Sequence, residues 1–206
     1  MSLPPATLSP EEEETRFYAA LGRTISQWQE VEAALSRIFC DLANPQAGSI
    51  ANVAFHTVLS FDSKLGMTHA AVGLGVNDVG RAEWSPLHNR ASRRNDRRNQ
   101  LAHFMVAYDP TRKPGYRYHL RPNIFDARAL LKWGDHPPVL NTCQLMASGA
   151  SFSKLARDLG SFHRRWIQFM VPGLAEVLSR SATRPPPEPD TLTDPIAEEP
   201  EPPPES

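Results

Sequence analysis

The chain has 206 residues, 40% hydrophobic and 22% charged, which is enough to fold around one hydrophobic core. No apolar run reaches the roughly 18 residues that cross a bilayer, and the N-terminus lacks the charged and apolar regions of a signal peptide, so we expect a soluble cytoplasmic protein with no membrane association. The net charge of −1 conceals a basic middle, with twelve of the 22 Lys and Arg in residues 81–132, and an acidic segment after Arg184; this asymmetry favours an anionic partner, although an arginine-rich solvated surface would produce it too.

The first predicted helix begins at Pro10. Ser9 is placed to cap it, Glu12 completes a capping box, and the run of glutamates suits the positive end of the helix dipole. An apolar seam with a spacing of four and three, broken at Thr24, then follows: Phe17, Leu21, Trp28, Val31, Leu35, Ile38 and Leu42. We expect this seam to pack lengthwise on other helices.

Three more helices are predicted before residue 104. Asn44-Pro45 separates the first helix from a second at about 46–59, and Ser60 or Asp62 caps a third at about 63–74. A cluster of Gly73, Gly75, Asn77 and Gly80 ends the third helix. The fourth helix is expected to run from about Trp84 to His103.

The second half of the chain mixes strands with one more helix. Aromatic-rich runs at 104–108 and 116–120 predict a β-hairpin, residues 121–142 are ambiguous, and a fifth helix is expected at about 152–170, continuing at 174–178. Residues 182–206 hold nine of the 20 prolines. We therefore predict an all-α, up-down bundle of about five helices with a β-hairpin appendage after helix four. A flexible segment at 1–8 precedes the domain at 9–181, and a disordered tail follows at 182–206.

Two arginines occupy positions at which the fourth helix should bury apolar side chains. One seam of that helix contains Trp84, Leu87, Ala91, Leu101 and Met105. Arg94 and Arg98 fill the two positions missing from it. Because burial of an unpaired charge is costly, each must find a carboxylate or line a wet cleft. Glu32, on the first helix, is the natural partner for one of them.

The end of the fourth helix carries the motif Arg98-Asn99-x-x-x-His103. Asn99 and His103 share a helix face, whereas Arg98 and His103 are about 140° apart and would flank a groove. The motif resembles the Arg-x(4–6)-His signature of the HEPN superfamily (higher eukaryotes and prokaryotes nucleotide-binding). Trp28-x-x-Val31-Glu32-x-x-Leu35 and Leu59-Ser60-Phe61-x-x-Lys64-Leu65 also resemble segments of bacterial HEPN-like families. The resemblance covers roughly residues 10–180.

The resemblance implies metal-independent cleavage of RNA by a homodimer that brings two motifs to one composite site. His103 would exchange a proton with the ribose 2′-OH or the leaving 5′-oxygen, and Arg98 would stabilise charge on the phosphoryl oxygens. Asn99 would orient the imidazole or bind a phosphate. No cofactor or metal is required, and the histidines and the two cysteines lack metal-ligand spacing. A toxin or antiphage effector with a cognate antitoxin or another protein partner would use such chemistry.

Further residues are candidates for contact with phosphate. Arg90, Arg94 and Arg97, together with Arg93, would form a phosphate-tracking strip, and Lys64 would add another cation. A solvated charged face would have the same composition. Two alternatives to the nuclease stay open: a non-catalytic HEPN-like module that binds RNA or a protein, and a structural helical dimer in which Arg98 pairs with Glu32.

Overall fold

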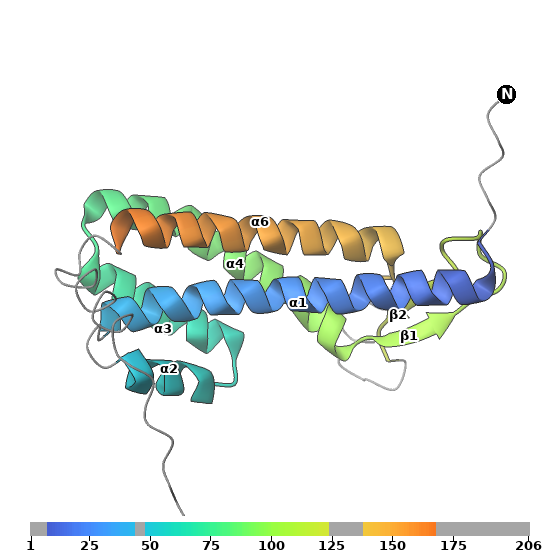
Figure 1. The fold of residues 1–206 in the computed structure, drawn as a ribbon, viewed down its shortest axis with the longest axis horizontal. Coiled ribbons are helices and arrows are strands. Elements are labelled where there is room, and N and C mark those ends of the chain that lie inside the picture. The colour runs from blue at the N-terminus through green and yellow to red at the C-terminus, as the bar shows by residue number, and fades with distance from the viewer. Residues whose placement is uncertain (1–7, 44–47, 124–137, 168–206) are drawn as a thin grey trace, which may run out of the picture. The chain divides into compact units, whose positions relative to one another are not determined.

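The computed structural model describes residues 8–43, 48–123 and 138–167 (Figure 1). Five helices lie in these ranges: α1 (Pro10–Ala43), α2 (Gly48–Thr57), α3 (Phe61–Gly75), α4 (Asp78–His103) and α6 (Thr142–Trp166). Three short strands accompany them: β1 (Met105–Tyr108), β2 (Tyr118–Arg121) and β3 (Leu140–Asn141). The prediction of a helical bundle with β-structure after helix four is confirmed. Three predictions lie outside the described residues: the continuation of the fifth helix beyond residue 167, the disordered tail at 182–206, and all but the last residue of the flexible segment at 1–8.

Helix α1 is the central element of the bundle, and its sequence features act as predicted. The Ser9 hydroxyl accepts the Glu12 amide at 3.2 Å, and the Ser9 amide donates to the Glu12 carboxylate at 2.8 Å. Five members of the predicted seam are buried, and Leu21 and Leu42 pack partly buried against the core. The prediction that this seam packs on other helices is therefore confirmed.

Thr24, which interrupts that seam, connects α1 to α6. Its buried hydroxyl lies 2.8 Å from the Ala20 carbonyl and 3.0 Å from the Leu145 carbonyl of α6, so it is satisfied by both helices. Gly149 faces this contact, where an added Cβ would lie 1.9 Å from Oε1 of Gln27. The buried hydroxyl of Thr24 and the missing side chain of Gly149 therefore allow the two helices to pack closely here.

Helix α4 runs antiparallel to α3 and α6, whereas α1 and α6, which lie side by side, run in the same direction (Figure 1). Aromatic rings fill the space between the helices. Trp28 of α1 contacts Phe61 of α3 and Phe152 of α6, with ring centroids 4.6 and 5.0 Å apart. Trp84 of α4 contacts Phe162 of α6 at 5.4 Å. These contacts place the core between α1, α3, α4 and α6. None of the helices in the described ranges has the length and apolar character needed to cross a bilayer.

Two helices begin earlier than the sequence predicted. Helix α4 starts at Asp78 because the Asn77 side chain accepts the Gly80 amide at 3.0 Å. Gly80, expected to break the third helix, lies inside α4, where a Cβ would be 3.0 Å from the Trp166 ring. Helix α6 starts at Thr142, not near Phe152, because Asn141 and Gln144 form a capping box.

The predicted hairpin belongs to a three-stranded antiparallel sheet. Strand β1 pairs with β2, with Val106 opposite Leu120, and β3 adds to the other edge of β2, with Leu140 opposite Leu120. The third strand was not predicted because two residues are too short to show the alternation of a strand.

A buried carboxylate fastens this sheet to α1. Glu13, only 2% exposed, accepts the Arg117 backbone amide at 2.6 Å and the Arg117 Nε at 2.7 Å. Arg117 also donates to the Leu8 carbonyl at 2.9 Å. Burial alone raises the pKa of the Glu13 carboxyl, but hydrogen bonds from the Gly115 backbone and from Arg117 outweigh it and hold the pKa below its ordinary value. We call Glu13 and Arg117 the sheet clamp.

Candidate functional site

The predicted motif lies in the last two turns of α4, where the bundle meets the sheet. The Phe104 amide donates to the Gln100 carbonyl at 2.9 Å, and Phe104 has extended backbone angles, so the helix ends at His103. The His103 side chain is exposed, and the side chains of Arg98 and Asn99 are half-buried. The motif is therefore open to solvent and is not enclosed by the core.

The structure brings two of the three motif side chains together. Nη1 of Arg98 donates to Oδ1 of Asn99 at 3.3 Å. Asn99 and His103 are one helical turn apart on the same face. Arg98 is therefore bonded to a side chain on the face of α4 that carries His103. Among the described residues, no hydrogen bond joins His103 itself to Arg98 or Asn99.

Glu32, expected to pair with an arginine of α4, is bonded to Lys64 instead. The Glu32 carboxylate accepts Lys64 Nζ at 2.8 Å and Trp28 Nε1 at 2.8 Å. Burial alone raises the pKa of Glu32, but the bonds from Lys64 and Trp28, with the nearby charge of Arg98, hold it below its ordinary value. Lys64 lies opposite Glu32 because α3 runs alongside α1, and it is 8% exposed. Its charge is thus committed to an internal ion pair, and Arg98 acts on Glu32 at longer range.

Four arginines of α4 have no carboxylate within ion-pair distance in the part of the chain that the structure describes: Arg93, Arg94, Arg97 and Arg98. We call these four residues the arginine strip. Nε of Arg94 donates to the hydroxyl of Ser151 on α6, and Nη1 of Arg97 donates to Oε1 of Gln100 at 2.8 Å. Both acceptors are neutral. Arg90, predicted to belong with them, instead forms an ion pair with Asp158 of α6 at 2.8 Å.

Two members of the arginine strip, Arg94 and Arg97, lie in surroundings that disfavour their positive charge. Burial lowers the pKa of Arg97, and burial together with the charges of Arg90 and Arg93 lowers the pKa of Arg94. A lowered arginine pKa means that the fold disfavours the positive charge at that position. A bound anion would offset this cost.

Asn95 is a candidate functional residue that was not predicted from the sequence. Its side chain is 6% exposed, and its Nδ2 donates to Oδ1 of Asp62 at the start of α3, 3.0 Å away. Its Oδ1 is buried with no partner among the described residues, which is costly. The signal was available, because Asn95, Asn99 and His103 are spaced by four and form one polar row along α4.

The chain was compared with protein-family models, with curated proteins and with solved structures, and none of them matches it. In the described ranges, no cluster of three or more His, Cys, Asp or Glu side chains could hold a metal ion. A function can therefore be proposed only from the side chains themselves, and the end of α4 offers the candidate site.

Proposed function

We propose that this protein binds RNA on the arginine strip of α4 and cleaves it at the motif formed by Arg98, Asn99 and His103. The observation that supports this proposal is the set of arginines without carboxylate partners, two of them partly desolvated, that leads along α4 to an exposed histidine. RNA phosphates would supply the missing negative charge. Release of counterions from RNA would add to the affinity.

The residue types suit an internal transesterification that needs no metal. The 2′-oxygen of RNA attacks the neighbouring phosphorus as it loses its proton, and the bond from phosphorus to the 5′-oxygen breaks. His103 accepts the first proton or supplies the one that the leaving 5′-oxygen takes up. Arg98, held beside Asn99, faces the phosphoryl oxygens on which negative charge accumulates. A homodimer would bring a second His103 to the same phosphodiester, so that one imidazole acts as base and the other as acid.

Cleavage is tested with labelled RNA in the presence of EDTA. We expect the wild-type chain to yield 2′,3′-cyclic phosphate ends. His103→Ala should slow cleavage by about a hundredfold or more because proton transfer is lost. His88→Ala, fifteen residues earlier in the same helix, is the control. Cleavage that persists in His103→Ala, or that cuts RNA with a 2′-deoxy residue at the scissile position equally well, would rule out this chemistry.

Binding is tested separately by the fluorescence anisotropy of a labelled single-stranded RNA. Arg94→Gln and Arg97→Gln should each weaken binding and each reduce the slope of log K against log salt by about 0.7. Arg157→Gln, on the exposed face of α6, should leave the slope unchanged. If all three substitutions weakened RNA binding equally, the attraction would come from the overall positive charge and not from a binding strip on α4.

Two observations define the alternatives. His103 has no hydrogen bond to Arg98 or Asn99 among the described residues, which favours a module that binds RNA or a partner protein without turnover; RNA binding would then survive His103→Ala with no cleavage in either chain.

The charge of Arg98 lowers the pKa of Glu32, which favours a structural role for Arg98 in a helical dimer. In that case, Arg98→Met should lower the melting temperature markedly, and the wild-type chain should not bind RNA.

A further inference from the structure

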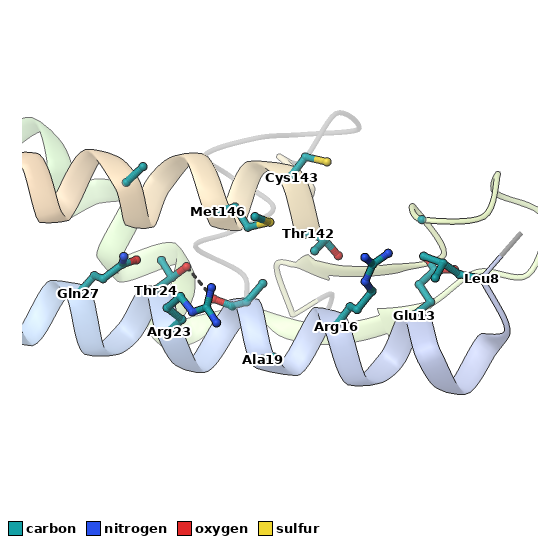
Figure 2. A pocket seen from close by; sticks show the side chains of 13 residues that line it. Leu8, Glu13, Arg16, Ala19, Arg23, Thr24, Gln27, Thr142, Cys143 and Met146 are labelled. Atoms are coloured by element: carbon teal, nitrogen blue, oxygen red, sulfur yellow. Dashed lines mark hydrogen bonds between the residues drawn. The ribbon is translucent and has the colours of Figure 1, made fainter. Parts of the chain in front are cut away.

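A pocket of about 600 Å³ lies between the N-terminal half of α1 and the first turns of α6, and no residue of α4 lines it (Figure 2). One stripe of α1 forms a wall, with Arg16, Ala19, Arg23 and Gln27 among its residues. The opposite wall is another stripe, made by Thr142, Cys143, Met146 and Ala150 of α6. Leu8, Glu13 and Gly115 lie at one end. This pocket is separate from the arginine strip and has no part in the proposed RNA chemistry.

The pocket exists because small side chains stand where two long helices run side by side. The helices are in contact at Thr24 and at Gly149, where their backbones approach closely. Beside that contact, Ala19 and Ala150 are too short to fill the space between the helices. Met146, 57% exposed, provides a flexible apolar surface over it. The walls are therefore largely apolar, as in most small-molecule sites, and the volume lies within the usual range of roughly 300–1,000 Å³ for such sites.

The uncommitted charges in the lining of the pocket are positive, and both lie on the α1 wall. Arg16 and Arg23 have no ion pair among the described residues, and Figure 2 shows Arg16 extending from α1 toward Thr142. Neither residues 15–29 nor residues 142–157 contain an aspartate or a glutamate. The one carboxylate in the lining, Glu13, is already committed to Arg117. The amino end of α6, with no acidic residue in its first turn, adds the partial positive charge of the helix dipole.

We infer that this pocket binds a small organic anion with an apolar body. Arg16 and Arg23 lie two turns apart on one face of α1, about 10 Å along its axis. Their long side chains can both reach an acidic group at the middle of the groove, where guanidinium groups form strong charge-assisted hydrogen bonds. The apolar body of the ligand lies against Ala19, Met146 and Ala150. An extended nucleic acid strand is less suited to this site because the carboxylate of Glu13 lies at one end of it.

Two fluorescent probes that differ in a single charged group test this inference on the full chain. The anionic probe is 8-anilinonaphthalene-1-sulfonate, and the neutral probe is N-phenyl-1-naphthylamine, which has the same rings without the sulfonate. We expect one molecule of the anionic probe to bind per chain. The double variant Arg16→Gln/Arg23→Gln should weaken the anionic probe by about tenfold or more and the neutral probe by less than about twofold.

Controls separate the pocket from general surface binding. Arg37→Gln removes another exposed arginine of α1 outside the pocket and should leave both probes unaffected. Ala19→Trp fills the pocket from an exposed position and should exclude both probes, and Ala150→Phe fills it from α6 with the same result. Unchanged binding of the anionic probe to the double variant, an equal loss of both probes in it, or full binding to both filled variants would overturn the proposal. RNA cleavage by the double variant should equal that of the wild type, so the two proposals can fail independently.

Discussion

The sheet clamp and the arginine strip differ in whether their charged side chains have an oppositely charged partner. In the sheet clamp, a carboxylate that is 2% exposed receives hydrogen bonds from a guanidinium and from backbone amides, so the charge inside the fold is fully matched. In the arginine strip, Arg94 and Arg97 are half-buried against neutral acceptors on Ser151 and Gln100. The difference separates charge that holds the fold together from charge that the fold carries at a cost.

The largest effect is expected from loss of the sheet clamp. Glu13→Gln keeps the shape of the side chain but leaves the Arg117 guanidinium, 13% exposed, without its counter-charge. Breaking a buried ion pair from one side typically costs about 3 kcal/mol or more, so chemical denaturation should show a loss of that order in the free energy of unfolding. Glu30→Gln, on the exposed side of α1, is the matched control and should change stability very little. Equal stability of the two variants would show that the sheet does not depend on this ion pair.

A second loss, of about 1–2 kcal/mol, is expected from Lys64→Met. Methionine fills a similar volume, but Glu32 then keeps only the Trp28 donor and the more distant charge of Arg98. Lys154→Met, at an exposed position on α6, serves as the control in the same denaturation experiment. A neutral outcome at Lys64 would mean that Arg98 moves in to replace it, which would return Arg98 to the structural role that the sequence first suggested.

A smaller effect is expected in the pH dependence of stability. The folded-state pKa of Glu13 lies below its ordinary value of 4.5. The ionised carboxylate therefore stabilises the fold fully above that value, and the stabilisation is lost as the pH falls through the folded-state pKa. The stability gap between the wild type and Glu13→Gln should then be constant near neutral pH and narrow below pH 4.5. A gap that does not narrow in acid would mean that the charge of Glu13 contributes nothing and that only its shape matters.

The features that could be predicted from sequence were local ones. The start of α1 was predicted from Ser9, Pro10 and Glu12 because a capping box needs only four consecutive positions, and its seam was predicted from its periodicity. The early start of α6 was missed because residues 143–151 contain serines and a glycine that weaken the helical signal, while Asn141 supplies the cap. The short strand β3 exists only through its pairing with β2, which depends on the fold as a whole.

In the candidate site, too, the local features could be predicted from the sequence and the contacts between helices could not. The positions of Arg98, Asn99 and His103 on one helix followed from their spacing. The partner of Glu32 did not, because the alignment of α3 beside α1 decides whether Lys64 or an arginine reaches it. The burial of Lys64 and the ion pair of Arg90 with Asp158 likewise depend on how neighbouring helices are aligned, so a list of basic residues could not separate structural cations from free ones.

The smallest effect on stability is expected at Arg97 in the arginine strip, and its sign shows whether this charge supports or opposes the fold. Because burial lowers the pKa of Arg97, its charge opposes folding. Arg97→Gln removes that charge and keeps a polar side chain, so the free energy of unfolding should stay within about 0.5 kcal/mol of the wild type or rise slightly. The same variant should bind single-stranded RNA more weakly. A stable variant with weakened RNA binding would show that the residue is retained for a ligand at the expense of the fold. A clear loss of stability at Arg97 would place it with the sheet clamp, as part of the structure, and would remove the main support for an RNA-contacting surface on α4.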